Sequence, residues 1–245
     1  ARKTFRDCGI DMPDGNEDLK TKEDIAAALA RLKRKNPAIR KAVVKMNDGF
    51  SGDGNAIYRY PELKIDDSLE ANILHSLSEN MKPVAHEVSK ELFFDKFYEM
   101  EGIVEEFLEG EIKVSPSVQC VIGTSEKINI DSTHDQLLGG EEGQIFLGAI
   151  FPADIEYAPA LAAIGRKVAE LLAKKGVRGR FAVDFISVRQ DDGTWKHFAI
   201  EINLRKGGTT HPFMMIQFLT DGYYDADKGV YLTASGNKRY YFASD

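Results

Sequence analysis

Two carboxylates and one amide near the end of the sequence have the types and spacing of a metal site. Asp184 lies in the apolar stretch 180–188, and Glu201 and Asn203 lie two residues apart in the stretch 197–204. Residues two apart in a strand share a face, so Asp184 joins the other two if the stretches pair as a hairpin. Hard oxygen ligands of this kind suit Mg²⁺. The trio predicts a magnesium site, although the polar face of a half-buried sheet would give the same pattern.

Two arginines lie close to this trio in the sequence. Arg180 shares the face of Asp184 by the same alternation, and Arg205 follows the second stretch directly. A guanidinium group binds phosphoryl oxygens through parallel hydrogen bonds. We therefore expect both arginines to hold phosphate groups beside the metal.

A glycine-rich loop, Gly-Phe-Ser-Gly-Asp-Gly, has the composition of an anion-binding segment. Gly49, Gly52 and Gly54 alternate with larger residues, among them Ser51, and glycines let backbone N–H groups approach phosphate oxygens closely. A strand-like stretch follows, whereas a dinucleotide fingerprint or a P-loop needs a helix there. The candidate Lys45 precedes the loop and no protein-kinase motif follows it. Taken alone, the loop is also compatible with a flexible hairpin. Lys45, taken alone, is compatible with a solvated lysine at a strand end.

The stretch Ile-Val-Glu-Glu-Phe-Leu-Glu-Gly-Glu, residues 103–111, runs from apolar residues into carboxylates. Such a strand end could place a backbone edge against an adenine and a carboxylate against ribose hydroxyls. An edge strand protected by charge is the alternative. Elsewhere, His134 and His211 lie in polar stretches and are the histidines that we expect to contact a substrate.

The elements that must position these residues alternate between helix-like and strand-like patterns. Helices are expected at 22–35, where Thr21 and Asp24 form a cap, at 67–82, at 89–100, and at 157–175 before Gly176. Strands are expected at 41–45, 55–60, 103–108, 112–122, 180–188 and 197–204. The Asp192-Gly193 step between the last two favours a hairpin. Hairpins imply largely antiparallel sheets, and so an α+β class.

Composition limits the classes of partner. The chain has 32 Lys and Arg against 39 Asp and Glu, a formal net charge of −7, which argues against nucleic acid and against a membrane surface. No apolar stretch reaches the roughly 18 residues of a membrane span. Cys8 and Cys120 lack metal-ligand spacing and are expected to be free thiols in a reducing compartment, which favours a cytoplasmic protein. A homodimer is left open.

In this order, the pieces make the chain resemble the ATP-grasp superfamily. The resemblance is carried by Val-Val-Lys-Met-Asn-Asp-Gly-Phe-Ser-Gly-Asp-Gly-Asn (43–55), Val-Glu-Glu-Phe-Leu-Glu-Gly-Glu (104–111), Gly-Arg-Phe-Ala-Val-Asp-Phe (179–185) and Glu-Ile-Asn-Leu-Arg-Lys-Gly-Gly-Thr-Thr-His-Pro (201–212). The last string, with Ser-Pro-Ser-Val-Gln (115–119) and Ser-Thr-His-Asp-Gln (132–136), is similar to the pheganomycin-type peptide ligase branch.

The resemblance implies two α+β subdomains with largely antiparallel sheets that enclose ATP, one at 1–102 bearing the lid and one at 103–245 binding metal and substrate. It implies ATP contacts from Lys45, Gly49, Ser51, Gly52, Gly54, Glu105, Glu106, Phe107, Leu108 and Glu111. It assigns Mg²⁺ to Asp184, Glu201 and Asn203, and the γ-phosphate or acyl phosphate to Arg205 and Arg180. Gly208, Thr209, Thr210 and His211 lie where the family commonly builds its acyl-substrate pocket.

The activity implied is that of an ATP-dependent carboxylate–amine ligase, which forms an amide through an acyl phosphate from amino-acid or peptide substrates. An ATP-binding module without turnover and an ATP-grasp small-molecule kinase are the alternatives. The family normally carries a further domain before the lid-bearing subdomain. We therefore expect this chain to be the nucleotide-binding half of a longer protein.

Overall fold

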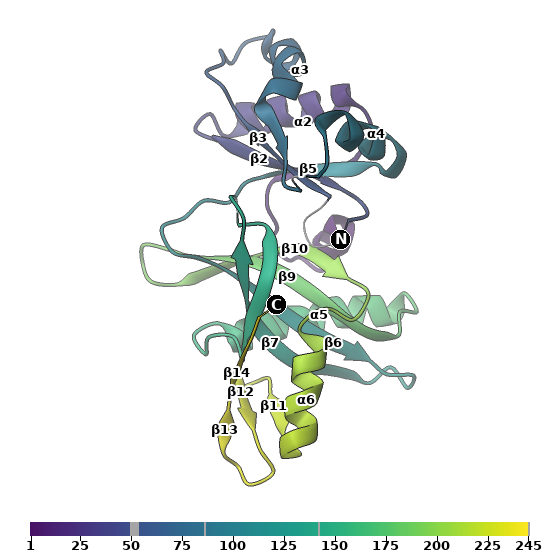
Figure 1. Cartoon of the computed structure of the whole chain (residues 1–245), viewed down its shortest axis with the longest axis vertical. Helices are drawn as coiled ribbons and strands as arrows, with labels where there is room; N and C mark the ends of the chain where they lie inside the picture. The colour runs from purple at the N-terminus through teal and green to yellow at the C-terminus, as the bar shows by residue number, and fades with distance from the viewer. Residues whose placement is uncertain (50–53, 86, 142, 245) are drawn as a thin grey trace. The chain divides into compact units, whose positions relative to one another are not determined.

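Residues 1–49, 54–85, 87–141 and 143–244 are described by the computed structural model of the chain (Figure 1). They form two units, which are described one at a time. Unit 1 comprises Ala1–Met12, Glu109–Leu138 and Phe146–Asp245, and unit 2 comprises Pro13–Leu108 and Gly139–Ile145. The functional boundary expected after residue 102 stays a prediction, while the units themselves divide after residues 12, 108, 138 and 145.

Unit 2 is built on an antiparallel sheet with the strand order β1-β5-β2-β3-β4. Its strands are β1 (Gly15–Leu19), β2 (Lys41–Met46), β3 (Asn55–Arg59), β4 (Met81–Pro83) and β5 (Gly102–Glu106). The strand β5, which contains the predicted adenine-binding stretch, lies between β1 and β2. The alternative interpretation of this stretch as an edge strand was therefore wrong.

Three helices supply the core of unit 2: α2 (Lys22–Lys35), α3 (Leu69–Asn80) and α4 (Lys90–Met100). The predicted cap of α2 is present, because Thr21 Oγ1 accepts from the Asp24 N–H at 3.2 Å and Asp24 Oδ2 accepts from the Thr21 N–H at 2.9 Å. Alternation in β3 turns Ala56 and Tyr58 into the helix-covered core. The other face of the strand carries Ile57, between the two core residues.

Unit 1 is built on a six-stranded sheet with the order β10-β9-β6-β7-β8-β14. Its strands are β6 (Lys113–Ile122), β7 (Ile128–Gly139), β8 (Ile145–Phe151), β9 (Gly179–Arg189), β10 (Trp195–Asn203) and β14 (Tyr241–Ser244). The predicted hairpin between β9 and β10 is present, and Gly193 takes a φ of +81° in its turn. That backbone conformation favours glycine.

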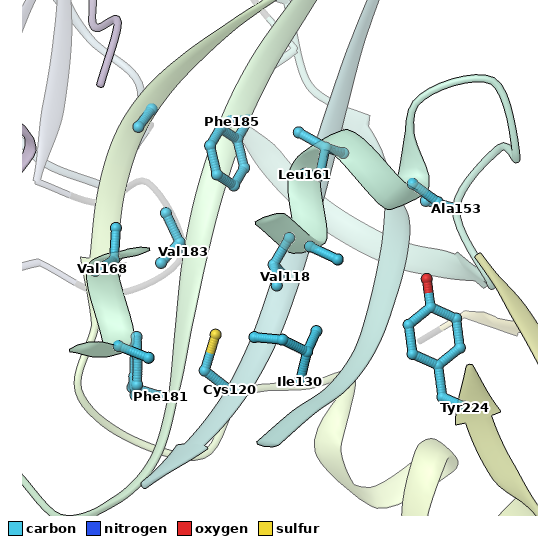
Figure 2. Close-up of a cluster of buried hydrophobic side chains, with 14 of the residues drawn as sticks. Val118, Cys120, Ile130, Ala153, Leu161, Val168, Phe181, Val183, Phe185 and Tyr224 are labelled. Carbon is cyan, nitrogen blue, oxygen red and sulfur yellow. The ribbon is translucent and has the colours of Figure 1, made fainter. Parts of the chain in front are cut away.

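The helix α5 (Ala158–Lys174) covers one face of this sheet. Figure 2 shows Leu161 and Val168 of α5 in one cluster with Val118, Val183 and Phe185 from the strands. Burying each such side chain contributes about 1.5–3 kcal/mol to folding. This apolar face leaves the opposite face of the same strands to carry the polar residues of the site.

The remaining elements of unit 1 are the helices α1 (Arg2–Asp7) and α6 (Thr210–Thr220) and a small antiparallel sheet of β11 (Tyr223–Asp225), β12 (Val230–Leu232) and β13 (Lys238–Arg239). Residues 1–12 were expected in the lid-bearing part but pack in unit 1. One of their contacts is the Ala199 N–H, which donates to the Asp11 carbonyl at 2.9 Å. Across the described ranges, no helix is both long and apolar enough to cross a membrane.

The predicted α+β class and the four predicted helices are confirmed, and so are the strands expected at 41–45, 55–60 and 112–122. One element was mispredicted at its end, because Met81 and Lys82 belong to β4 and not to the preceding helix. Met81 is fully buried beside that helix. The apolar pattern therefore continued across the boundary between the two elements.

Candidate functional site

A buried ion pair marks the face of the unit 2 sheet that is turned away from the helices. Lys45 Nζ lies 2.8 Å from Glu105 Oε2, and their side chains are 17% and 2% exposed. The pair is diagonal across β2 and β5, because Val43 is the direct partner of Glu105 and Ile103 that of Lys45. This pair restricts the position of the Lys45 ammonium group, and the phosphate contact expected of it stays a prediction.

The glycine-rich loop begins and ends beside this lysine. The Met46 N–H donates to the Gly54 carbonyl at 2.9 Å, and a Cβ added to Gly49 would lie 3.0 Å from the Cα of Gly54. The two ends of the loop are thus in close contact, and a larger residue at Gly49 would require the backbone at Gly54 to shift. Ser51 and Gly52, which were also expected to bind ATP, lie outside the described residues.

The end of β5 is held on both sides. Glu106 Oε1 accepts from the Asp14 N–H at 3.0 Å, and the Phe107 N–H donates to the Lys41 carbonyl at 3.2 Å. Lys41 Nζ also lies over the Phe107 ring, 5.1 Å from its centroid. These contacts fix the chain at the end of β5, and the adenine contact expected there stays a prediction. Leu108 ends unit 2, and the predicted ribose ligand Glu111 is an exposed residue of unit 1, just before β6.

The predicted metal trio is brought together on the hairpin of unit 1. Glu201 is the direct cross-strand partner of Asp184, and Asn203 Nδ2 donates to Asp184 Oδ2 at 2.9 Å. This bond orients the Asn203 amide and leaves its Oδ1 as the atom that a cation would use. The donor set of two carboxylates and one amide oxygen fits Mg²⁺.

An extra residue in β10 is what places Glu201 beside Asp184. The strands pair Ala199 with Phe185 but Glu201 with Asp184, so Ile200 is a bulge. In a regular ladder Ile200 would oppose Asp184, and the two carboxylates would lie on opposite faces. The bulge therefore assembles the site. In the part of the chain that the structure describes, no group of three or more His, Cys, Asp or Glu side chains could hold a metal ion. The predicted trio differs from such a group because its third member, Asn203, is an amide.

The two predicted phosphate-binding arginines have different surroundings. Arg180 makes a close ion pair with Asp131, whose side chain is 8% exposed and accepts a second hydrogen bond from Asn129 Nδ2 at 3.2 Å. Asp131 is itself a bulge residue in β7. Arg205 is exposed, and its Nη1 donates to the Lys206 carbonyl at 3.1 Å. The phosphate contacts expected of Arg180 and Arg205 stay predictions.

The polar face continues across the sheet beyond the metal trio. Ser117 is the cross-strand partner of both Asp184 and His134, so one row runs over β10, β9, β6 and β7. A parallel row contains Gln119 and Ser132. Sequence reasoning did not assign Ser117, Gln119 or Ser132 to the site. The signal for Ser117 and Gln119 was the alternation of polar residues in the stretch 113–122.

His134 is completely buried in this row. Its Nε2 lies 2.8 Å from the Tyr241 hydroxyl, and its ring lies 5.1 Å from that of Phe151. Burial lowers the pKa of the imidazole from 6.5 to about 3, so it is neutral at physiological pH. The substrate contact expected of His134 stays a prediction, and its ring is fully covered in this structure.

The segment after the metal ligands leads into α6. The Gly207 N–H donates to Thr210 Oγ1 at 3.1 Å, Thr209 and Thr210 are buried, and His211 is exposed. A Cβ added to Gly208 would lie 3.1 Å from the Phe146 ring. The backbone turn is thus tight, and its substrate role stays a prediction.

Comparison with known proteins adds a family to this geometry. Residues 63–227 match the family model described as IQCH-like, ATP-grasp. The chain is 33% identical over 236 residues to an L-propargylglycine–L-glutamate ligase of Streptantibioticus cattleyicolor. The aligned region covers 95% of this chain and 45% of that protein.

Solved structures share the fold. A biotin carboxylase domain of Hydrogenobacter thermophilus, solved with MgADP, is 17% identical with a TM-score of 0.59, over 93% of this chain and 42% of that one. An N5-carboxyaminoimidazole synthetase of Staphylococcus aureus, solved with ADP, is 14% identical with a TM-score of 0.55, over 93% and 48%. The chain therefore spans about half the length of these relatives.

Proposed function

The chain belongs to the IQCH-like ATP-grasp family, and from this membership we propose that it is an ATP-dependent carboxylate–amine ligase acting on amino acids or peptides. The 33% identical relative is named as a ligase of two amino acids, which supports this substrate class. The observation that carries the proposal is the trio on the hairpin of unit 1, where a bulge brings Glu201 beside Asp184 and Asn203.

In this proposal Mg²⁺ is held by Asp184, Glu201 and Asn203, and it neutralises charge on the phosphates of ATP when bound. Lys45 adds a positive charge against the phosphates from unit 2, and the end of β5 binds the adenine. Arg205 steadies the phosphoryl group that is transferred. The protein contributes positioning and charge neutralisation, which dominate catalysis of phosphoryl transfer.

The proposed reaction has two steps. A substrate carboxylate oxygen attacks the γ-phosphorus and ADP leaves, which gives an acyl phosphate. The nitrogen of an amine then attacks the acyl carbon, inorganic phosphate leaves, and the amine loses a proton as the amide forms. Exclusion of water protects the acyl phosphate from hydrolysis between the steps.

The test measures nucleotide binding and turnover on the same protein. Binding of a non-hydrolysable ATP analogue is titrated with Mg²⁺, and ADP release is followed with pairs of amino acids, glutamate among them. Asp184→Asn should raise the Mg²⁺ concentration required for binding about tenfold or more, since even outer-shell substitutions reach that size. Glu170→Gln, an exposed carboxylate of α5, is the matched control.

Two results would count against the proposal. Nucleotide affinity that changes neither with Mg²⁺ nor with Asp184→Asn would refute the assignment of the metal site. If no pair of acid and amine stimulates ADP release, the proposed ligase activity is refuted. A phosphate ester found by mass spectrometry would instead identify a kinase.

A further inference from the structure

A pocket in unit 2 lies outside the residues assigned to the nucleotide. It is lined by β3, by β4 and the residue after it, and by the turn that joins β7 to β8, and every lining residue belongs to unit 2. Ile57, Val84 and Ile145 give it an apolar wall. Gly140 lies against Ile145, because a Cβ there would lie 2.9 Å from Ile145 Cδ1.

Charged groups of both signs stand at the rim of this pocket. Glu141 Oε1 lies 4.0 Å from Arg59 Nη2, and Glu141 Oε2 makes a closer ion pair with Lys82 Nζ. The three side chains are 46–59% exposed. Gln144 Oε1 accepts from Asn55 Nδ2 at 3.2 Å, which orients its Nε2 as a donor. Two cations thus face one carboxylate beside an apolar wall.

The pocket stands on the same sheet face as the predicted phosphate-binding lysine. Direct cross-strand partners run from Lys82 through Ile57 and Val43 to Glu105, so these four residues share a face. Neighbouring strands lie about 4.8 Å apart, which puts the pocket roughly 10–14 Å from Glu105. That is far enough for a separate ligand and near enough for one that reacts with a bound nucleotide.

We propose that this pocket binds a free α-amino acid with a short apolar side chain. The carboxylate of the ligand meets Arg59 and Lys82, its ammonium group meets Glu141, and its side chain packs on Ile57 and Ile145. No charge is left without an opposite partner in this arrangement, and no other polar group is needed on the ligand. The inference rests on the proposed function, in which the bound amino acid is a substrate of the ligase.

The binding experiment uses the full chain with labelled isoleucine and valine methyl groups and without nucleotide. L-valine is titrated beside isovalerate, which lacks the ammonium group, and isobutylamine, which lacks the carboxylate. We expect saturable NMR shifts at the methyls of Ile57, Val84 and Ile145. Each analogue should bind about fivefold more weakly than valine, the upper range for an exposed charge pair.

Substitutions identify the groups that bind. Arg59→Gln and Lys82→Gln should each weaken valine binding about fivefold, whereas Glu141→Gln should weaken valine but not isovalerate. Lys35→Gln, which removes the lysine of another exposed ion pair of unit 2, is the control and should have no effect. Circular dichroism of every variant verifies folding.

The inference is overturned if valine and isovalerate bind equally, or if valine shifts only methyls outside the pocket. It is also overturned if the substitutions lower the melting temperature and leave valine affinity unchanged, because the ion pairs then only hold the turn onto the sheet. A non-hydrolysable ATP analogue that displaces valine from these methyls would show that the pocket belongs to the nucleotide. ADP release is measured separately, so a failure of the pocket proposal can be distinguished from a failure of the ligase proposal.

Discussion

Removing the charge of Lys45 tests whether the buried pair with Glu105 holds unit 2 together. At an effective dielectric of about 20, two charges 2.8 Å apart attract by about 6 kcal/mol before the cost of removing them from water. Breaking a buried pair on one side costs about 3–5 kcal/mol. Because the Lys45 side chain keeps 17% exposure, we expect Lys45→Met to cost about 3 kcal/mol.

The assay is a double-mutant cycle on the full chain, with Lys45→Met, Glu105→Gln and both together. The only tryptophan, Trp195, lies in unit 1. Its fluorescence therefore reports the other unit and serves as an internal control. Amide hydrogen exchange in β2 and β5 gives the local free energy of opening in each variant.

The double variant should recover most of the stability that the lysine variant loses, because it no longer buries an unpaired carboxylate. The coupling energy expected between the two positions is about 2 kcal/mol. Purely additive losses would refute the reasoning, since the two side chains would then stabilise the sheet independently.

Two further predictions concern unit 1. Gly165→Ala should destabilise it by about 1–3 kcal/mol in urea unfolding followed by Trp195 fluorescence, because a Cβ there would lie 2.7 Å from Val118 Cγ1. This overpacking outweighs a gain in helix propensity of at most about 1 kcal/mol. An equally stable variant would mean that the core shown in Figure 2 adjusts at this contact without loss of stability. The pKa of His134 falls from 6.5 to about 3 on folding, so the unfolded chain binds the extra proton and stability decreases as the pH falls below 6.5. That loss is about 2 kcal/mol between pH 7 and pH 5 by the same linkage, and a His134→Gln variant that kept it would contradict the assignment.

Alternation along two short strands led to the prediction that the trio shares one face, because its members come from one hairpin. The bulge at Ile200 was not predictable from that pattern, and without it Glu201 would face away from Asp184. The predicted common face of Asp184, Glu201 and Asn203 is present, but it depends on the bulge at Ile200 and not on alternation alone. A single extra residue in one strand has no sequence signature apart from the pairing that it interrupts.

The rows beyond the trio depend on partners far apart in the sequence. Ser117 joins Asp184 to His134 only through the registers of β6 with β9 and with β7. Likewise, the internal position of β5 follows from its pairing with β1, which local propensity does not specify. Contacts within a hairpin were therefore predicted, and contacts set by long-range register were not.

The division of the chain into interleaved segments has a consequence for its synthesis. Unit 2 is contained in residues 13–108 except for the turn at 139–145, so most of it can fold while later residues are still being translated. Residues 1–12 are translated before unit 2, yet the partner of the Asp11 carbonyl is Ala199. Residues 1–12 therefore reach their native contacts only after β10 has been translated, and unit 1 is expected to be the slower unit to fold.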